Sequence, residues 1–384
     1  MKVIKRHIYL NKEQIDLFNR TKSACRFVYN KMIELNSENY KKDNKSKFIG
    51  YIEFSKLLNN YYRKNFKDEY SWLDKIPSKP IKESLRNCDK AFKMFFEKKS
   101  GFPKFKSKKV DKTGIYIPKN NKKDFTVVFR NKIKIPLFGF VYLKEFGLID
   151  LSNVTSCTIV ERNYKYYINF LIKEENKIID SNLNGTIGID LGIKSLAVLS
   201  NGVSFKGISK IKKIKKLNKK LKRLNRSLSR KLEANKNNKE ESTKKSNIVK
   251  TVRFISNINA SIKNITEGYI NNIIDTVVIT KPKNVVIETL NVRGMIKNRK
   301  LAKQIHNSCF YKFSKILEYK CSKNNINLVK ADRFYPSTQT CSNCGNVKTK
   351  DEKLTLKDRI YKCKCCGFKE DRDLNAAINL SKLV

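Results

Sequence analysis

The stretch GTIGIDLGIKSLAVLSNG, residues 185–202, decides how the rest of the sequence is interpreted. It places Asp190 among isoleucine and leucine residues, where burying a charge without a partner is costly. Gly188 and Gly192 stand two residues to either side and leave room for close approach to the backbone. The Asn-Gly pair at 201–202 predicts a tight hairpin between two strands. Two interpretations of Asp190 stay open at this point: a functional carboxylate on a central strand, or an acid that ends a strand or accepts a local hydrogen bond.

The composition indicates a nucleic-acid partner. With 384 residues the chain is long enough for two or three domains, and a hydrophobic content of 40% supports a folded protein. Lys and Arg number 84 against 35 Asp and Glu, which gives a net charge of +49. A protein so far from neutrality repels itself, so we expect a large polyanion to neutralise it. The alternative is a solvated Lys-rich surface that reflects coding bias, but such bias alone would hardly leave acids this scarce.

Membrane and secretion signals are missing from the sequence. No run of about 18 apolar residues occurs, which predicts no transmembrane helix and no membrane partner. The N-terminus, MKVIKRHIYLNKEQ, lacks the apolar core of a secretory signal, which favours a cytoplasmic location. In a reducing compartment clustered cysteines are more often metal ligands than disulfides, and five of the ten cysteines cluster within residues 341–366.

The N-terminal part of the chain predicts a sheet with a helical insertion. Residues 2–10 alternate basic and apolar side chains, which is typical of a strand. Apolar residues then follow helical spacing over 12–40, 52–66 and 78–99. From 114 to 175 the period changes to two, which indicates short strands in a small β-barrel or curled sheet. Because a short N-terminal strand is marginal alone, we expect it to join this sheet, with the helices as an insertion.

The region after the opening stretch predicts a basic helical hairpin. A polar linker, residues 173–184, precedes the stretch. Residues 208–247 place Ile and Leu at intervals of three and four among many Lys and Arg, which predicts an amphipathic helix that gives way to a loop over 234–247. A second helix, about 248–275, is expected to return along the first. The hairpin is either solvated or an arm along nucleic acid, and the charge favours the arm. Residues 301–325 predict another amphipathic helix.

Two further acids repeat the pattern of Asp190. Glu288 ends the apolar run of a strand-like segment, and it could instead cap a helix or form a salt bridge. The C-terminal EDRDLNAAINLSKLV places Asp373 or Asn375 near the start of a final helix. Acids on three separate elements suit phosphodiester cleavage with two Mg²⁺ or Mn²⁺ ions, because carboxylate oxygens are the ligands that these cations prefer.

The most specific local signal is a pair of cysteine clusters. Cys341-Ser-Asn-Cys344-Gly and Cys363-Lys-Cys365-Cys366-Gly each resemble a zinc knuckle. Their separation of 18 residues (363 minus 345) matches a four-cysteine zinc ribbon, so we assign Cys341, Cys344, Cys363 and Cys366 as ligands of one Zn²⁺. Cys365 competes in principle, but only Cys366 precedes a glycine as Cys344 does. The scattered cysteines are predicted to be core residues: Cys25, Cys88, Cys157, Cys309 and Cys321.

The order of these motifs resembles the TnpB family of transposon-encoded RNA-guided DNA nucleases, relatives of the type V CRISPR effectors. The resemblance rests on GIDLGIKSLAV, VVIETLNVRGM, ADRFYPSTQTCSNCG and CKCCGFKEDRDLNAAINL, and it extends to CRFVYNKM, CDKAFKMFF and GFPKFKSKK, so it covers nearly the whole chain. It implies a multidomain α+β fold: an N-terminal wedge β-barrel with an inserted helical recognition domain, then an RNase H-like α/β RuvC domain interrupted by a zinc ribbon. The implied boundaries are 1–11 plus 112–180 for the barrel, 12–111 for the recognition domain, 183–335 plus 369–384 for the RuvC domain with the basic hairpin 208–275, and 336–368 for the ribbon.

The resemblance also implies an activity and the residues that carry it. A guide RNA from the transposon end would direct cleavage of double-stranded DNA beside a short transposon-adjacent motif. Asp190, Glu288 and Asp373 match the family's three metal-binding acids, and Asp373 is preferred to Asp371 because the family's acid lies in the pattern D-x-N-A-A. The segment SKPIKESLRN departs from the family's usual pattern, so the residues that read the adjacent motif are not assigned. A monomer is favoured, in a prokaryotic cytoplasm and on the nucleoid when bound to DNA.

Two other functions compete with this one, a nuclease-inactive RNA-guided DNA-binding repressor and a strand-transfer transposase. The presence of all three acids argues against the repressor. The ribbon between the second and third acids, and the guide-type N-terminal region, argue against the transposase. If Asp190 is a metal ligand, the glycines beside it would leave room for metal and scissile phosphate. Contacts with nucleic acid are predicted for eight basic residues: Lys82, Arg86, Lys104, Lys106, Lys212, Lys216, Lys220 and Arg223.

Overall fold

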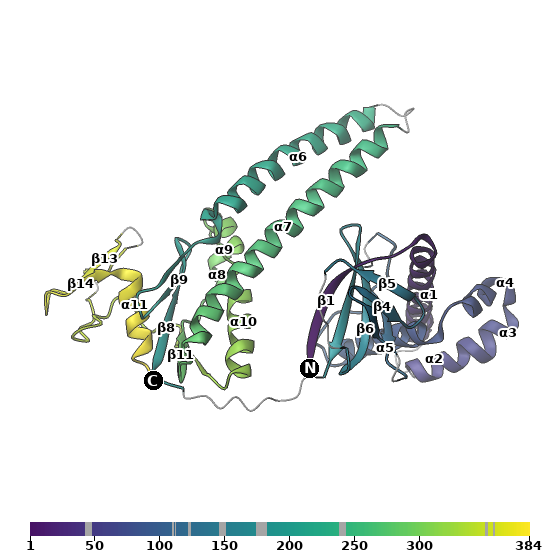
Figure 1. Ribbon diagram of the computed structural model, residues 1–384, viewed down its shortest axis with the longest axis horizontal. Coiled ribbons are helices and arrows are strands. Elements are labelled where there is room, and N and C mark those ends of the chain that lie inside the picture. Colours follow the sequence, from purple (N-terminus) through teal and green to yellow (C-terminus); the bar gives the residue numbers. More distant parts are fainter. Residues whose placement is uncertain are drawn as a thin grey trace. The chain divides into compact units, whose positions relative to one another are not determined.

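The computed structural model divides the chain into two compact units, residues 1–176 and 177–384 (Figure 1). It describes all residues except 43–47, 110, 112, 122–123, 146–150, 174–182, 238–242, 350–351 and 356–357. Most of the predicted linker 173–184 therefore lies outside the described residues. Among the described helices, none is long and apolar enough to cross a membrane. Each unit is built on its own sheet.

An antiparallel seven-stranded sheet forms the core of the first unit, in the order β2-β6-β7-β1-β5-β4-β3. Its strands are β1 Lys2–Tyr9, β2 Ile115–Pro118, β3 Thr126–Phe129, β4 Lys132–Ile135, β5 Gly139–Leu143, β6 Val154–Arg162 and β7 Lys165–Ile172. The prediction that the first strand joins the later ones is confirmed, because β1 pairs with β7 and with β5. The expected closure into a barrel is not seen. The described residues show no pairing between β2 and β3, and these outer strands of four residues each offer little ladder for closure.

The helices of the first unit lie between β1 and β2 in the chain, as predicted. The two long ones are α1 Lys12–Lys42 and α5 Ser78–Phe96. Between them the chain forms α2 Tyr51–Leu57, a π-helical turn Leu58–Tyr62, α3 Arg63–Asn65, α4 Lys67–Tyr70 and a 3₁₀ turn Ser71–Lys75. Phe18 of α1 belongs to the core of the sheet, whereas Val28 and Met32 pack with Leu85 and Phe92 of α5 in a separate helical core. The helical spacing of apolar residues predicted over 78–99 therefore corresponds to core packing at Leu85, Cys88 and Phe92, whereas Phe96 is 52% exposed.

The second unit contains a mixed five-stranded sheet in the order β10-β9-β8-β11-β12. Its strands are β8 Thr186–Leu191, β9 Ser195–Leu199, β10 Ser204–Lys206, β11 Asn284–Ile287 and β12 Asn327–Lys330. The predicted hairpin is confirmed, because β9 and β10 pair antiparallel across Gly202, which has a φ of +87°. β11 runs parallel to both β8 and β12. The stretch 185–202 thus supplies β8, the central strand of this sheet.

Helices cover both faces of the second sheet, and the alternation of side chains along β8 decides what each face receives. The helices are α6 Lys212–Asn237, α7 Thr243–Ile279, α8 Val292–Ile296, α9 Ala302–Ser308, α10 Phe310–Lys323 and α11 Arg372–Ser381. Ile187 and Ile189 belong to the core formed with α7 and α10. Because successive side chains of a strand point to opposite faces, Gly188 and Asp190 face α11, which lies on the other side of β8 (Figure 1). The C-terminal helix is therefore brought to the central strand by the pleat of β8.

Two helix predictions and one loop prediction are corrected in detail. The second helix of the basic hairpin begins at Thr243 and ends at Ile279, so the predicted loop 234–247 is helical at both ends, and 238–242 lie outside the described residues. The predicted helix 301–325 is broken into α9 and α10 at Cys309, whose φ is +54°. This residue adopts a left-handed conformation that ends α9 and starts α10. The cysteines predicted to be core residues are buried or half-buried.

The sequence predicted that Gly188 leaves room for a metal or a phosphate. This prediction is wrong, because the backbone of α11 fills the space beside Gly188. A Cβ atom there would lie 2.0 Å from the backbone oxygen of Ala377 and 2.6 Å from the backbone nitrogen of Ser381, both on α11. Only glycine allows α11 to approach the strand this closely. Gly192 instead faces the carbonyl of Ser195 in the turn after β8.

Gly188→Ala should destabilise the protein by about 3 kcal/mol, because the added methyl group meets rigid backbone that cannot rotate away. Urea unfolding of the purified full-length chain would measure this. The control is Gly268→Ala in α7, where a Cβ meets nothing within 4 Å. That substitution should be neutral or slightly stabilising, since alanine favours helix by about 1 kcal/mol. Equal effects of the two substitutions would contradict the close approach of α11.

Candidate functional site

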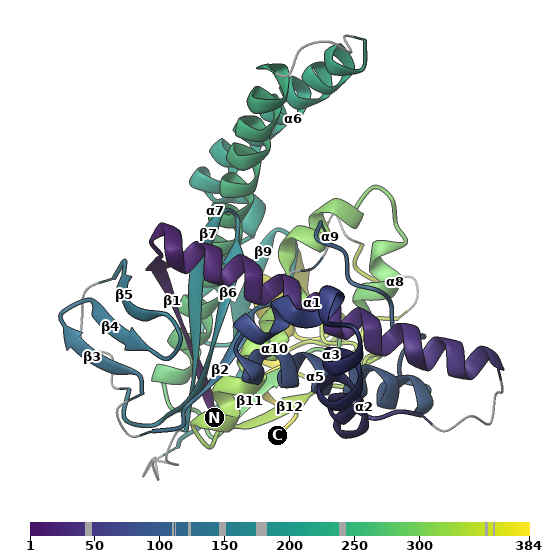
Figure 2. The same ribbon diagram turned by 90° about the vertical axis from the view of Figure 1, so that its right-hand side faces the viewer.

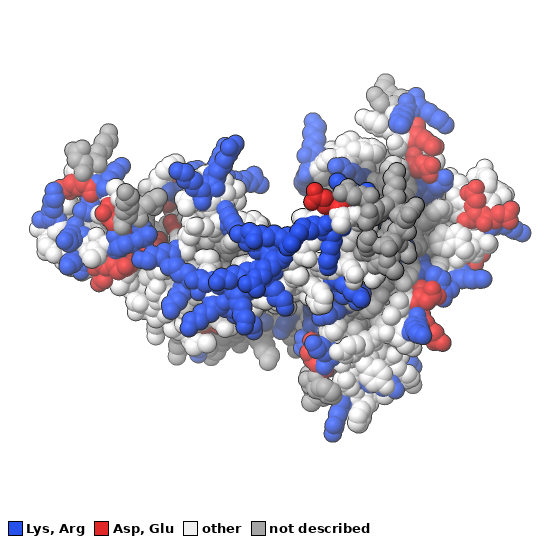
Figure 3. Space-filling model, turned by 90° about the horizontal axis from the view of Figure 1, so that it is seen from above, with Lys and Arg blue, Asp and Glu red and all other residues white. Residues whose placement is uncertain are grey.

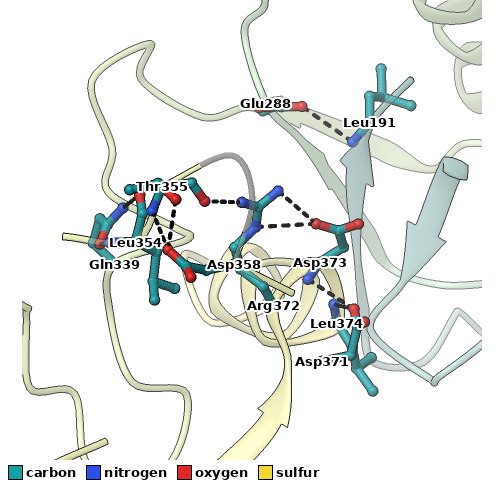
Figure 4. A network of polar contacts seen from close by, with 10 residues as sticks. All are labelled: Leu191, Glu288, Gln339, Leu354, Thr355, Asp358, Asp371, Arg372, Asp373 and Leu374. Carbon is teal, nitrogen blue, oxygen red and sulfur yellow. Dashed lines mark hydrogen bonds and ion pairs between the residues drawn. The ribbon is translucent and has the colours of Figure 1, made fainter. Parts of the chain in front are cut away.

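Three acidic residues from three separate elements, Asp190, Glu288 and Asp373, lie beside the central strand of the second unit, where the charges of Glu288 and Asp373 act on Asp190. Figure 4 shows Glu288 and Asp373 with their hydrogen-bond partners. Asp190 lies on β8, opposite Val198 of β9, and is only 8% exposed. Glu288 directly follows the end of β11, and its Oε1 atom accepts a hydrogen bond of 3.2 Å from the backbone nitrogen of Leu191. Because β8 and β11 are parallel neighbours, their carboxyl ends place these two acids at the same edge of the sheet.

Asp373 enters the site from the first turn of α11. Asp371 is the N-cap of this helix, and its Oδ1 atom accepts hydrogen bonds from the backbone nitrogens of Asp373 at 2.9 Å and Leu374 at 3.2 Å. Asp371 therefore fixes the start of the helix (Figure 4), while the charge of Asp373 acts on both Asp190 and Glu288. The sequence alone left Asp373 and Asn375 open. The structure places Asp373 near the acids and directs Asn375 elsewhere.

The electrostatics of the site are those of crowded carboxylates, of which Asp190 is buried and Glu288 and Asp373 are half-buried. Burial raises the pKa of Asp190 well above its ordinary value, and the charges of Glu288 and Asp373 raise it further. Burial also raises the pKa of Glu288 to about 7, opposed by the hydrogen bond from Leu191. Like charges held close together disfavour ionisation unless a cation joins them. The donor set of hard carboxylate oxygens fits divalent cations such as Mg²⁺ or Mn²⁺.

Arg372 is a residue of this site that the sequence interpretation missed. Its Nη2 atom lies 3.2 Å from Oδ1 of Asp373, and its Nη1 atom donates a hydrogen bond of 3.0 Å to the carbonyl of Thr355 (Figure 4). The guanidinium is largely buried, and its charge also lowers the pKa of Asp190. Thr355 lies in the segment between the two cysteine clusters, so Arg372 connects that segment to the third acid. The only sign of this role in the sequence is that Arg372 directly precedes Asp373.

The four assigned cysteines form one cluster. Their sulfur atoms all lie within 4.8 Å of one another, with Cys341 and Cys366 separated by 3.7 Å and Cys344 and Cys363 by 3.6 Å. These separations match the edge of a tetrahedron around Zn²⁺, which is about 3.8 Å for zinc–sulfur bonds of about 2.3 Å. They are far longer than a disulfide bond. Cys365 is exposed and lies outside the cluster.

The two halves of the cluster have the same backbone geometry. Gly345 donates to the carbonyl of Cys341 at 2.9 Å, and Gly367 donates to that of Cys363 at 3.1 Å. Both glycines have a positive φ, of 76° and 72°, which explains why each cysteine pair is followed by glycine. A hydrogen bond from the backbone of Phe368 lowers the pKa of Cys366 to about 6. The strands β13 Ile360–Lys362 and β14 Lys369–Asp371 flank the second half.

Two buried asparagines fasten the cysteine cluster to α11. Asn375 accepts a hydrogen bond of 2.9 Å from the backbone nitrogen of Ser342 and donates one of 2.8 Å to the carbonyl of Thr340. Asn379 donates to the carbonyls of Ser337 and Thr340 at 2.8 and 2.7 Å. The helix that carries Asp373 is thus held by the chain around Cys341.

The predicted nucleic-acid contacts fall into two groups. Lys212, Lys216, Lys220 and Arg223 are exposed along α6, where Figure 3 shows Lys and Arg gathered in a dense band. Lys82, Arg86 and Lys104 are exposed in the first unit. Lys106 differs from both groups. Its Nζ atom lies 3.6 Å from the ring centroid of Tyr29, its backbone exchanges two hydrogen bonds with Asn30, and burial lowers its pKa. This is the environment of a structural residue.

Comparisons with known proteins identify the family. Family models match residues 1–45 ("Helix-turn-helix domain"), 169–299 ("Probable transposase") and 310–380 ("Cas12f1-like, TNB domain"). A Streptomyces pristinaespiralis protein, provisionally named an RNA-guided DNA endonuclease, is 28% identical over 389 residues, 99% of this chain and 88% of that protein. InsQ of Escherichia coli K12, named in the same way, is 27% identical over 376 residues, 94% and 87% of the two chains. The TnpB-like protein L79 of Acanthamoeba polyphaga mimivirus is 31% identical over 105 residues, 26% and 19% of the two chains. The chain belongs to the TnpB family.

The fold of this TnpB-family chain is also found in a solved structure. A Cas12f1–sgRNA–target DNA complex matches with a TM-score of 0.57 and 17% identity, covering 97% of this chain and 83% of that one. The helix-turn-helix match at 1–45 corresponds here to β1 and the whole of α1, a single helix of 31 residues. The cysteine cluster and α11 fall within the 310–380 match.

Proposed function

We propose that this chain is an RNA-guided DNA endonuclease that cleaves target DNA by metal-dependent phosphodiester hydrolysis. The observation that carries the proposal is the convergence of Asp190, Glu288 and Asp373, from three elements, at one edge of the sheet. The names of the relatives that span nearly the whole chain, which describe RNA-guided DNA endonucleases, support it. We further propose that the five-stranded sheet belongs to an RNase H-like RuvC domain and that the first unit contains a wedge domain. The strand order β10-β9-β8-β11-β12 supports the first of these assignments.

The three carboxylates would hold two Mg²⁺ or Mn²⁺ ions. When bound, such ions supply Lewis-acid stabilisation of the charge that develops on the phosphodiester. Burial raises the pKa values of Asp190 and Glu288, because it disfavours their charged forms. Bound cations would stabilise those charged forms. Arg372 holds Asp373 in place and leaves one of its carboxylate oxygens outside the ion pair, since both guanidinium contacts are with Oδ1. The four cysteines would hold one Zn²⁺ as a structural ion.

Guide RNA and double-stranded DNA are the proposed partners. Base pairing would supply the sequence specificity, and the protein would contribute backbone contacts and recognition of a short adjacent motif. The exposed basic residues of α6 lie on one face at intervals of three and four residues, which suits a phosphate backbone.

The test is cleavage by the protein purified with its co-expressed RNA. Supercoiled plasmid carrying a matched target behind a randomised flank is offered with Mg²⁺, and a matched plasmid without the target is the control. Target-dependent linearisation supports the proposal. Tight, target-dependent binding without cleavage would instead show a repressor, and joined products would show a strand-transfer transposase.

Replacing Lys216, Lys220 and Arg223 together by Gln should weaken DNA binding at every sequence and make it less sensitive to salt. If each contacts one phosphate, the slope of log K against log salt should fall by about 2.7, since each neutralised phosphate of a duplex contributes about 0.9. The control is Lys315→Gln, because Lys315 already pairs with Glu318 at 3.1 Å. Fluorescence anisotropy at four salt concentrations measures the slopes. An unchanged slope for the triple variant would place the arm away from nucleic acid.

A further inference from the structure

One face of the first unit's sheet carries a row of exposed aromatic side chains with lysine between them. The strand registers place Tyr9 opposite Tyr142, Tyr142 opposite Lys132, and Lys132 opposite Phe129. The row therefore crosses β1, β5, β4 and β3, four consecutive strands that lie side by side in Figure 2. Phe140 lies two residues from Tyr142 on β5 and so faces the same side.

These aromatic residues are not part of the core. The residues that alternate with them, Ile8, Ile133, Val141 and Leu143, are buried in the core on the opposite face of the sheet. Phe129 is 65% exposed, Tyr9 54%, Tyr142 49% and Phe140 48%. A sheet with one buried and one solvated face normally presents polar side chains to water. Four large rings on the solvated face are the reverse of that pattern.

Cations lie among the rings. The Nζ atom of Lys132 is 4.7 Å from the ring centroid of Phe140 and 5.6 Å from that of Tyr142. The guanidinium of Arg130 is 5.6 Å from the centroid of Phe129. Lys134 is exposed opposite Phe140. The patch therefore combines flat apolar surfaces with positive charge.

The same face continues onto β7. The ring of His7 is 5.0 Å from that of Tyr9 and 5.2 Å from that of Tyr167, and the Nζ atom of Lys5 is 4.1 Å from the centroid of Tyr167. The carboxylate of Glu145 accepts a weak hydrogen bond of 3.4 Å from the backbone nitrogen of His7 at the edge of the patch. The aromatic and basic character thus extends over five neighbouring strands.

Rings with cations between them fit unpaired nucleotides. Bases offer flat faces that stack on Phe and Tyr, and phosphates at regular intervals meet the lysines. A duplex would present its backbone and hide the faces of its bases. A protein partner is disfavoured, because interface cores are depleted of Lys. Two of the rings carry hydroxyl groups, which donate and accept hydrogen bonds and so match the 2′-hydroxyl of ribose.

We propose that this aromatic-lysine face, formed by Tyr9, Phe129, Lys132, Phe140 and Tyr142, binds an unpaired segment of RNA by base stacking. The inference rests on the proposed function in one respect, that the RNA concerned is part of the guide. The stacking itself is independent of the nuclease site, whose residues all lie in the second unit.

The test compares single-stranded and duplex probes. Full-length protein, freed of nucleic acid at high salt, is titrated into labelled unstructured RNA of about 15 nucleotides, into the same sequence as a duplex, and into single-stranded DNA. Phe140→Ala with Tyr142→Ala should weaken binding of the single-stranded RNA by about ten-fold or more, the effect of losing stacking partners. Duplex binding should stay within about two-fold. Tyr142→Phe, which keeps the ring, should retain most of the affinity.

The matched control is Tyr311→Ala, which removes an even more exposed ring, 70% exposed on α10 in the second unit. It should leave RNA binding unchanged. Equal losses for single-stranded and duplex RNA, no loss in the double variant, or a preference for DNA would each overturn the proposal.

Crosslinking keeps the proposal testable if the double variant does not fold. RNA containing 4-thiouridine is irradiated with wild-type protein, and crosslinked peptides are mapped by mass spectrometry. Crosslinks on β1, β4 and β5 are expected, and crosslinks confined to other segments would refute the inference. Failure here and failure of the proposed function are distinguishable. Wild-type cleavage without crosslinks on this face rejects only the stacking, and crosslinks without cleavage reject only the nuclease.

Discussion

Asp190→Asn is expected to abolish target-dependent plasmid cleavage, with a loss of about a thousand-fold or more. The side chain keeps its size but loses the charge that would hold divalent cations, and the neighbouring acids cannot replace it from other elements. Binding of guide RNA and target DNA should stay within a few-fold, because Asp190 is buried on β8 and does not belong to the exposed basic surfaces. Single-turnover cleavage with Mg²⁺, together with a binding assay on the same preparations, measures both.

The same substitution should stabilise the metal-free protein. The folded state raises the pKa values of Asp190 and Glu288, so ionising them opposes folding. This penalty is absent at pH below about 3, where both groups are protonated in the folded and unfolded chains. It grows as the pH rises toward 7 and Glu288 ionises near its pKa of about 7. In EDTA, the wild-type free energy of unfolding should therefore fall between pH 4 and pH 7, whereas that of Asp190→Asn should fall less.

Asp371→Asn is the matched control, an acid-to-amide change on the same C-terminal segment. Asparagine caps helices as well as aspartate does, so the start of α11 should be preserved. Cleavage should remain within a few-fold of wild type. The assignment of the acids would be contradicted by a variant pair in which Asp371→Asn is inactive and Asp190→Asn cleaves.

Much of this site could be predicted because its signals are local. The alternation of apolar residues with Asp190, the Asn-Gly turn and the glycine after each cysteine pair each specify a backbone conformation within a few residues. The strands, the hairpin and the grouping of the four cysteines followed from such patterns. Asp373 needed more, because the helix start alone fitted Asn375 equally well and the preference came from the resemblance to the TnpB family.

The parts that could not be predicted depend on contacts between distant segments. Gly188 looked like space for a ligand, yet its partner is the backbone of α11, nearly two hundred residues later. The hydrogen bond from Arg372 to the carbonyl of Thr355 depends on where the segment near Thr355 lies. The break at Cys309 depends on a left-handed residue that apolar periodicity does not reveal. The exposed rings of β5 look like an ordinary alternating strand until the register shows which face is covered.

Cys344→Ser is expected to release the zinc and to reduce cleavage severely. A four-cysteine site binds Zn²⁺ with a free energy on the order of 10 kcal/mol, and this energy is available to fold the surrounding chain. Wild-type protein should contain one zinc per chain by elemental analysis, and the variant close to none. The matched control is Cys365→Ser, since Cys365 is exposed and outside the cluster. It should keep one zinc and full cleavage, and a loss of zinc in this control would contradict the ligand assignment.

The loss of cleavage should arise through α11 rather than through the acids themselves. Asn375 binds the backbone on both sides of Cys341, Asn379 binds the carbonyls of Ser337 and Thr340 just before it, and Arg372 binds the carbonyl of Thr355 between the two cysteine pairs. When the cysteine cluster loses its metal, these anchors lose a fixed partner and Asp373 loses its position. Asn375→Ala isolates this step, because it should retain one zinc per chain while cleavage falls by about ten-fold or more, a size typical for residues that orient a metal site. Full cleavage by zinc-depleted Cys344→Ser would show instead that the cluster and the nuclease site are independent.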